Sequence, residues 1–446
     1  MEKSRRTFLK HTAKGSAILA AGGILPGFSA KSYAAIPGAN ERVRVGVMGV
    51  NARGLALAQN FAKQPNCEVV SISDVDSRAS QKCITKVEDI QKNRPTDVPD
   101  FRKALEQKDM DALIIAAPDH WHAPAAILAA KAGKHVYLEK PCSHNPHEGE
   151  LLVAAQKKYK TVIQMGNQRR SWPNVIKGIQ ELKDGAIGRA YFGKGWYTNN
   201  RKSIGRGKEA AVPEWLDYDL WQGPAPRKAF RDNLIHYNWH WFWNWGTGEA
   251  LNNGTHMIDL LRWGMGVDYP IRVTSSGGRY RYEDDWETPD TQVINLEFDN
   301  NSSMTWEGRS CNGKPLEGNT VGVVFYGEKG SLMIDGNAYT IFDLDGKVAK
   351  DVKNDLKIDA RNLTNPAEAL DALHFQNFFD GIRKGAPLNS DILSGHQSTL
   401  LCQLGNIALR TGGTLHTDPS NGRIKNNKEA QKLWKRTYQP GWEPTV

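Results

Sequence analysis

Short apolar runs rich in β-branched residues alternate with helix-forming stretches over residues 43–165. We predict strands at 43–49, 68–74, 111–117, 135–138 and 161–165, and helices at 55–62, 125–132 and 146–157. Buried strands that alternate with helices are typical of a parallel sheet built from β-α-β units. The pattern therefore predicts an α/β fold for this part of the chain.

The pattern changes after Ile187, where longer strands of antiparallel type are predicted. These strands are expected at 189–197, 291–298 and 320–326, separated by turns rich in Gly, Asp and Asn. A sheet of this kind with helices on one face is an α+β layer. A helix predicted at 366–384 would pack back on the first unit, which is the part of the chain with the predicted parallel sheet, residues 43–165.

The N-terminal residues have the features of an export signal. The segment SRRTFLK at 4–10 carries paired arginines, an apolar run follows, and small residues end at Ser32-Tyr33-Ala34. This order describes a cleavable signal, and the arginine pair resembles the twin-arginine type. The apolar run is short, glycine-rich and broken by Pro26, so it is a poor membrane span. We predict an export signal at 1–35 and a periplasmic mature protein without a membrane span.

Composition and charge argue against several classes of protein. Hydrophobic residues make up 39% and charged residues 24% of the chain, as in globular proteins with a sizeable core. The net charge is +9, but the segment 1–34 carries six basic residues and one acid. No basic run with interleaved aromatics follows, so we predict no nucleic-acid partner. The five cysteines are far apart and indicate neither a disulfide framework nor a zinc site.

The turn after the first predicted strand has the spacing of a dinucleotide-binding loop. Gly49, Asn51 and Gly54 form the pattern G-x-N-x-x-G and lead into a helix. The first glycine of such a loop allows the tight bend, and the last allows close contact between helix and strand. Asn51 departs from the usual middle glycine, although asparagine tolerates left-handed backbone angles. A generic βα turn would explain the motif nearly as well if it stood alone.

Asp74 strengthens the dinucleotide interpretation, because it ends the second strand 20 residues after Gly54. An acid at this place accepts hydrogen bonds from the adenosine ribose and repels a 2′-phosphate. We therefore predict NAD as the cofactor, while Arg78 keeps NADP open as the alternative. Polar residues also follow the next strands, at 118–122 and 139–141. Open parallel sheets bind ligands at these carboxyl ends.

The sequence AAPDHWHAPAAILAAKAGKHVYLEKP, residues 116–141, resembles the Gfo/Idh/MocA oxidoreductase family. The resemblance implies an N-terminal Rossmann domain, here 40–168. It also implies a C-terminal α+β domain, 169–446, with a large open, mostly antiparallel sheet. Because this sheet often mediates oligomers in the family, we expect a homo-oligomer. The residues expected at the cofactor are Gly49, Asn51, Arg53, Gly54, Asp74, Pro118, Asp119, His122, Glu139, Lys140 and Asn167.

The resemblance assigns the chemistry to Lys140, His256 and Asn252. In the family, the lysine of E-K-P lies beside the nicotinamide and the hydroxyl being oxidised. Burial and a nearby positive charge lower the pKa of such a lysine, so it can accept a hydroxyl proton. The family carries D-x-G-x-H in the second unit, where Gly254 and His256 match and Asn252 replaces the aspartate. Asparagine cannot take up a proton, so Lys140 and His256 would share the acid–base work. The alternative for Lys140 is a structural salt bridge with Glu139.

Four tryptophans fall within WHWFWNW, residues 239–245. Their even alternation predicts that all four lie on one face of an extended segment, and Thr247 is expected to cap the next helix. Sugar rings stack on indoles, which favours a carbohydrate substrate, although we expect two of the four in the core. The residues expected at the substrate are Lys140, Arg169, Trp241, Asn252 and His256.

The helix after this segment would place Asn252, His256 and Asp259 on one face. A metal site built from His236, His240, His256, Glu249 or Asp259 is the weaker interpretation. These residues show no compact ligand spacing, so we predict no metal.

Three functions are compatible with these features. The first is a nicotinamide-dependent oxidoreductase that acts on a secondary hydroxyl of a sugar, sugar derivative or glycoside and retains its cofactor after export. The second is a glycoside hydrolase or epimerase that works by transient oxidation and elimination. The third, of another class, is a binding protein that keeps the dinucleotide fold without turnover.

Overall fold

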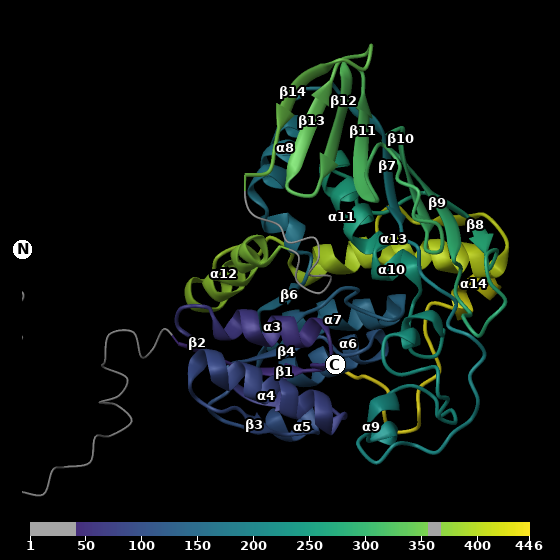
Figure 1. Cartoon of the computed structure of the whole chain (residues 1–446). Helices are drawn as coiled ribbons and strands as arrows, with labels where there is room; N and C mark the ends of the chain where they lie inside the picture. The colour runs from purple at the N-terminus through teal and green to yellow at the C-terminus, as the bar shows by residue number, and fades with distance from the viewer. Residues whose placement is uncertain (1–41, 356–366) are drawn as a thin grey trace, which may run out of the picture. The chain divides into compact units, whose positions relative to one another are not determined.

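Six parallel strands form the first sheet of the computed structural model, which describes residues 42–355 and 367–446 (Figure 1). The strand order is β3-β2-β1-β4-β5-β6. The strands are β1 (Val43–Met48), β2 (Cys67–Ser73), β3 (Thr96–Asp97), β4 (Ala112–Ile115), β5 (His135–Leu138) and β6 (Ile163–Met165). The crossover direction reverses between β1 and β4, and such a switch point is where open parallel sheets bind ligands. The predicted parallel sheet is confirmed.

Helices pack on both faces of this sheet and bury two apolar clusters. They are α3 (Arg53–Ala62), α4 (Ser77–Gln91), α5 (Phe101–Ala104), α6 (Asp119–Lys131) and α7 (Pro146–Tyr159). The helix predicted at 125–132 begins earlier, at Asp119. Its first turn, Asp-His-Trp-His, carries no apolar periodicity. The backbone N–H of His120 finds its partner far along the chain, in the carbonyl of Trp245.

A ten-stranded sheet follows, in the order β14-β13-β12-β11-β7-β10-β9-β8-β15-β16. Only the pair β7–β10 is parallel among its described strand pairs, so the predicted mostly antiparallel sheet is confirmed. The strands are β7 (Ala190–Thr198), β8 (Arg272–Gly278), β9 (Thr291–Phe298), β10 (Ser302–Arg309), β11 (Val321–Gly327), β12 (Gly330–Asp335), β13 (Ala338–Phe342), β14 (Val348–Val352), β15 (Leu415–Thr417) and β16 (Ile424–Lys425).

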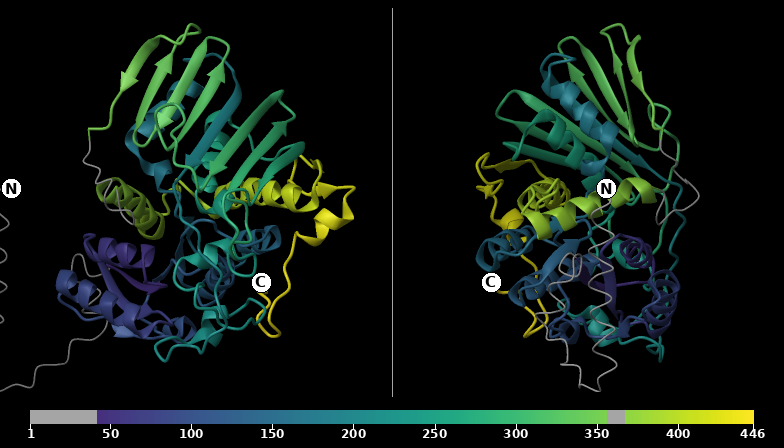
Figure 2. Two further views of the ribbon diagram at one scale, coloured as in Figure 1. Left: turned by 45° about the vertical axis from the view of Figure 1, so that its right-hand side comes forward. Right: turned by 90° about the vertical axis from the view of Figure 1, so that its left-hand side faces the viewer.

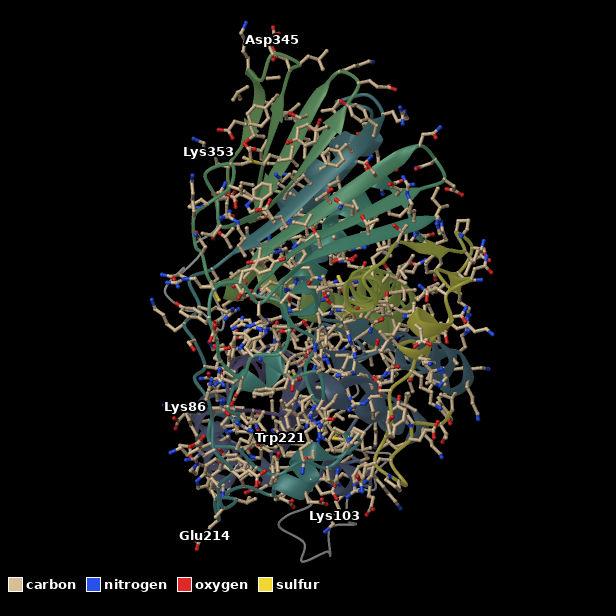
Figure 3. The ribbon with its side chains drawn as sticks, turned by 90° about the vertical axis from the view of Figure 1, so that its right-hand side faces the viewer. Lys86, Lys103, Glu214, Trp221, Asp345 and Lys353 are labelled. Atoms are coloured by element: carbon tan, nitrogen blue, oxygen red, sulfur yellow. The ribbon has the colours of Figure 1, made fainter. Side chains whose placement is uncertain are left out.

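Helices lie on one face of the large sheet, and Figure 2 shows α8 and α11 against it. The opposite face carries no helix in the part of the chain that the structure describes (Figure 3). The remaining helices are η3 (Gln168–Ser171), α8 (Pro173–Lys183), α9 (Tyr218–Gln222), η4 (Asn238–Trp241), α10 (Glu249–Asn252), α11 (Gly254–Met265), α12 (Glu368–Lys384), α13 (Ile392–Thr411) and α14 (Lys428–Lys432). One apolar cluster joins this sheet to α8, α11 and α13.

Helix α12 packs back on the first sheet, as predicted. The aromatic ring of Phe375 lies 4.6 Å from that of Phe61 on α3. Asp371 accepts a hydrogen bond from the Arg53 guanidinium at 3.2 Å, and Lys63 pairs with Glu368 at 2.6 Å. These contacts bring a carboxylate of the second half of the chain to the edge of the glycine turn.

The C-terminal segment after α14 also returns to the first unit. The indole of Trp442 meets that of Trp121 edge to face at 5.3 Å, and the Arg102 guanidinium lies 4.7 Å over it. The backbone N–H of Gln439 donates to the carbonyl of Pro224 at 3.0 Å. The last described residues thus cover the outer side of α6.

The predicted export signal, 1–35, lies outside the described residues. Within the described ranges, every helix is too short or too polar to cross a bilayer.

A buried ion pair links η3 to α11. The Arg170 guanidinium donates to both oxygens of Asp259 at 2.8 Å, and the hydroxyl of Ser398 donates to the same carboxylate at 2.7 Å. Although burial alone would raise the pKa of Asp259, Arg170 outweighs it and the pKa is lowered. Asp259 therefore supports Arg170 rather than His256, with which it was expected to share a face.

We expect Asp259→Ala to lower the free energy of unfolding by about 3–5 kcal/mol, because it leaves a buried guanidinium unpaired. Urea denaturation of the purified protein measures the change. The matched control is Glu88→Gln, which breaks an exposed pair with Arg94 and should cost less than about 1 kcal/mol. Equal effects of the two substitutions would contradict this account of the ion pair.

Candidate active site

A cavity of about 750 Å³ opens at the carboxyl ends of β1, β4 and β5. Its wall includes Gly49 after β1, Ala117 after β4 and Lys140 after β5. Residues from the second unit complete it, among them Asn252 and His256. The cavity therefore lies where the strand order predicts a ligand.

The glycine turn fits a dinucleotide. Gly49 has φ +80°, and a Cβ there would lie 2.6 Å from the backbone of Ala117. A Cβ on Gly54 would lie 1.7 Å from the carbonyl oxygen of Gly49, so this residue brings α3 close to the turn without lining the cavity. Asn51 is exposed and lines the cavity. Helix α3 has no side-chain cap, which leaves backbone N–H groups of its first turn for a pyrophosphate.

Asp74 also lines the cavity, at the end of β2. Its two oxygens accept hydrogen bonds from the backbone N–H groups of Val50 at 2.6 Å and Asp76 at 2.9 Å. Burial raises the pKa of Asp74, and these N–H groups oppose the change. Each carboxylate oxygen keeps a second lone pair for a ribose hydroxyl. Arg78, the residue that kept NADP open, pairs with Asp76 at 2.9 Å.

Lys140 is held by the second unit. Its Nζ donates to the backbone carbonyl of Asn252 at 2.7 Å and to the side-chain Oδ1 of the same residue at 3.3 Å. Burial lowers the pKa of Lys140, against the opposing pull of Glu139 and Asp119. The alternative of a Lys140–Glu139 salt bridge is wrong, because Glu139 pairs with Arg53 at 2.9 Å instead.

Glu139, Arg53 and Asp371 form a hydrogen-bonded cluster in the wall of the cavity. Glu139 also accepts hydrogen bonds from the Gln168 amide at 3.1 Å and the backbone N–H of Lys140 at 3.2 Å. Burial would raise the pKa of Glu139, but the charges of Arg53 and Lys140 outweigh it and lower the pKa. Through its hydrogen bond with the backbone N–H of Lys140, Glu139 fixes the backbone from which the Lys140 side chain extends.

Three predicted cofactor residues at the start of α6 line the same cavity: Pro118, Asp119 and His122. The ring nitrogens of His122 lie 2.7 Å from the carbonyl of Ala117 and 2.5 Å from that of Pro141, so this ring ties the ends of β4 and β5 together. Asp119 is buried and accepts a hydrogen bond from Thr247. The expected helix cap by Thr247 is therefore wrong, and Gly248 takes the cap position.

His256 shares the cavity with Lys140, as expected. Burial and the charge of Lys140 lower the pKa of His256 well below its ordinary value, and its Nδ1 is buried without a hydrogen-bond partner. The predicted single helix is broken at Asn253, which separates α10 from α11. Asn252 and His256 therefore approach the cavity from two different helices.

The tryptophan segment is not extended, contrary to our prediction. Residues 238–241 form the 3-10 helix η4, and Trp241 stacks on Trp286 at 3.8 Å, buried away from the cavity. Trp245 is also buried, so two of the four indoles belong to the core, as predicted. Trp239 lines the cavity instead of Trp241. The predicted substrate contact of Trp241 is thus replaced by one from Trp239.

Of two other predicted site residues, one lies in the cavity wall and one does not. Arg169, expected at the substrate, lines the cavity. Asn167, expected at the cofactor, does not; it is buried just behind, and neither of its side-chain polar atoms has a partner in the protein. Sequence reasoning missed further wall residues of the second unit: Tyr197 on β7, and Asn199, Arg201, Tyr237 and Asn253 outside helices and strands.

No group of three or more His, Cys, Asp or Glu side chains within 42–355 and 367–446 is arranged to hold a metal ion. The candidate ligand His236 bonds to Asp76 at 2.8 Å. The ring of His240 is stacked on Trp239 at 3.6 Å. The chemistry of the cavity is that of a dinucleotide site with a lysine and a histidine.

This fold and site define a Rossmann-type oxidoreductase. Residues 43–167 match the model described as oxidoreductase family, NAD-binding Rossmann fold, and 193–444 match oxidoreductase family, C-terminal alpha/beta domain. The chain belongs to the Gfo/Idh/MocA oxidoreductase family. The resemblance inferred from the sequence is confirmed. The N-terminal domain of this family is an NAD-binding Rossmann fold, so the predicted cofactor NAD is confirmed as well.

Relatives and solved structures extend the comparison. The chain is 29% identical over 253 residues to a glycosyl hydrolase family 109 protein of Saccharopolyspora erythraea, covering 51% of this chain and 55% of the relative. It is 26% identical over 232 residues to such a protein of Shewanella sp. (strain ANA-3), covering 48% and 50%. The chain thus spans about half the length of the curated relatives it matches.

Two solved structures share the fold. Levoglucosan dehydrogenase in complex with NADH and levoglucosan superimposes with a TM-score of 0.64 at 19% identity, over 84% of this chain and 99% of that one. The WlbA dehydrogenase from Bordetella pertussis, in complex with NADH and UDP-GlcNAcA, gives 0.61 at 20% identity, over 84% and 99%.

We expect Asp74→Ser to change the ratio of kcat/KM for NAD over NADP by roughly 10- to 100-fold toward NADP, because a charged acceptor of the ribose is removed. Reconstitution of cofactor-free protein with each dinucleotide measures the ratio. The control is Asp97→Asn, on the exposed strand β3. A wild-type protein that accepts both dinucleotides equally would contradict this role of Asp74.

Proposed function

We propose that this protein oxidises a secondary hydroxyl of a sugar, sugar derivative or glycoside, with NAD as the hydride acceptor. One observation carries the proposal: Lys140, with its lowered pKa, lies in one cavity with His256, the glycine turn and Asp74. The ligands named for the two solved structures support a sugar substrate. Trp239 offers an indole face in the same cavity for a sugar ring.

Lys140 is positioned to accept the hydroxyl proton. A neutral amine has two N–H bonds and one lone pair. Both N–H bonds have an acceptor in Asn252, its backbone carbonyl and its Oδ1. The lone pair is therefore left for the substrate hydroxyl. Asn252 acts here by orienting the base, which an asparagine can do without taking up a proton.

His256 is positioned to hold the same hydroxyl. With its pKa far below neutrality, the ring is uncharged and offers one N–H donor and one acceptor. Its unpartnered Nδ1 makes it ready to bond to a ligand. Bound NAD supplies the site that accepts the hydride. Lys140 and His256 bind, orient and deprotonate the hydroxyl that gives it up.

We propose that the protein is exported and retains its cofactor. If a twin-arginine-type signal at 1–35 carries the protein to the periplasm, it leaves the pool of free nicotinamide behind. The hydride taken from one substrate then returns to that substrate or passes to a second one. We propose a homo-oligomer through the face of the large sheet that carries no described helix.

A second candidate function is net hydrolysis or epimerisation of a glycoside. The relatives named glycosyl hydrolase family 109 proteins favour it. Oxidation beside a C–H bond makes that proton acidic and allows elimination. The same groups at Lys140 and His256 would begin this reaction.

We expect kcat/KM to fall tenfold per pH unit as the pH drops below the pKa of Lys140. This pKa is lowered by burial, and the neutral amine is the active form. Lys140→Arg, which is always protonated, should lose about 10²- to 10⁴-fold in kcat/KM. His256→Gln should lose activity but keep the fall of kcat/KM at low pH, the acidic limb of the pH profile. The reason is that His256 is already neutral over this range. An acidic limb that persists in Lys140→Arg and vanishes in His256→Gln would contradict these roles.

We expect protein purified from the periplasm to release NAD on denaturation and, when supplied with sugars and aryl glycosides, to form a keto-sugar. Mass spectrometry identifies both molecules. Release of the aglycone without accumulated keto-sugar would instead support the hydrolase. A protein that holds no dinucleotide and turns over neither class would be a binding module.

A further inference from the structure

Among the described residues, three arginines line the cavity, and two of them have carboxylate partners. Arg53 pairs with Glu139 and Asp371. The guanidinium of Arg201 donates to Glu249 at 2.8 Å and to the hydroxyl of Tyr237 at 2.8 Å. The positive charges of both residues are therefore satisfied by the protein itself.

Arg169 is the exception. Its Nη1 is buried and has no hydrogen-bond partner, and the structure gives its guanidinium no ion pair within 42–355 and 367–446. The flat group lies 5.2 Å over the ring of Trp172. Burial lowers the pKa of Arg169 below the ordinary value, and the nearby charges of Asp335 and Asp371 only partly oppose it. Arg169 is half-buried at the cavity wall, and its buried Nη1 donor is unfavourable unless a ligand bonds to it.

The position of Arg169 points to the substrate rather than to the phosphates of the cofactor. The pyrophosphate is expected at the glycine turn after β1, whereas Arg169 follows β6, three strand positions away in the sheet. At the usual strand spacing this is about 14 Å. The charge of Arg169 acts directly on His256, whose pKa it helps to lower after burial and Lys140. Arg169 thus lines the same cavity as His256 and follows β6, away from the strand that leads into the glycine turn.

Neighbouring groups also lack partners. Asn167, two residues before Arg169, has both side-chain polar atoms unpaired, and so has the Nδ1 of His256. Buried polar atoms are nearly always bonded in proteins, so the unpaired atoms of the two cavity-lining residues, Arg169 and His256, indicate a polar ligand. A planar guanidinium binds a carboxylate through two parallel hydrogen bonds, which a lysine cannot do.

We propose that the substrate is an acidic sugar whose carboxylate is bound by Arg169, with a hexuronate as the simplest case. The inference rests on the proposed oxidation of a sugar hydroxyl and narrows its substrate class. The carboxylate neutralises Arg169 while Lys140 and His256 hold the reacting hydroxyl. A sugar phosphate would offer the same charge from another source, and the test distinguishes the two.

The test compares matched sugars with the NAD-loaded protein. We would measure kcat/KM for glucuronate and galacturonate, for the neutral parents glucose and galactose, and for their 6-phosphates. A charge-assisted pair of hydrogen bonds predicts an acid preferred over its neutral parent by roughly 10- to 100-fold. In Arg169→Gln the ratio of acid to neutral sugar should fall to about one, and Arg169→Lys should give an intermediate ratio.

The matched control is Arg94→Gln, an exposed arginine paired with Glu88, which should leave the ratio unchanged. Neutral sugars used as well as acids by the wild type, phosphates preferred over carboxylates, or a ratio that survives Arg169→Gln would each overturn the proposal. The proposal would also be overturned if Arg169→Gln mainly lowered the affinity for NAD.

Calorimetric titration of the wild-type protein with glucuronate and glucose keeps the proposal testable if the variants fail to fold. Tighter binding of the acid by at least about tenfold supports it, and equal or absent binding overturns it. Tight binding of the acid without any oxidation would refute the proposed oxidoreductase activity while supporting the acidic ligand. Oxidation of neutral sugars alone would support the oxidoreductase activity and refute the acidic ligand.

Discussion

The hydrogen bonds from Lys140 to Asn252 are the interaction on which the site depends. They join the carboxyl end of β5 to the C-terminal end of the four-residue helix α10, so they form only when the two units are packed together. The same packing removes the amine from water and lowers its pKa. A single contact therefore fixes the direction of the amine, and the burial that accompanies it lowers the pKa of Lys140.

Two buried carboxylates near the site, Glu139 and Asp259, are each neutralised by an arginine, and the first of these pairs leaves Lys140 without a bonded carboxylate. Glu139 is held by Arg53, and Asp259 by Arg170. Had Glu139 been free, it would have paired with the adjacent ammonium and kept Lys140 protonated. The arginine on α3 thus determines the chemistry of the lysine on the neighbouring strand end.

The first sheet could be read from the sequence because its signals are local. Runs of β-branched residues, the glycine spacing and the acid at Asp74 each follow from a few neighbouring residues. Lys140 and His256 could be placed together because their motifs fix their positions in a known topology.

Features that depend on distant partners could not be predicted. Helix α13 is buried along nearly its whole length and carries polar residues such as Gln403 and Asn406, so it shows no amphipathic period. Those residues bond to Ser143 and Thr247, far away in sequence. The alternation of tryptophans suggested a strand, but stacking of Trp241 on Trp286 favours a tight turn instead. Tertiary packing overrode the local pattern in both cases.

The return of the C-terminal segment to α6 has a consequence for the order in which the molecule matures. Strands β1, β2 and β4 are synthesised early and can pair locally, yet Trp121 stays uncovered until Trp442 has been made. Contacts between residues so far apart form slowly, because a long stretch of chain must first be ordered. The helix that carries Asp119, and with it one wall of the cavity, is therefore fully supported only when the segment around Trp442 has packed onto it.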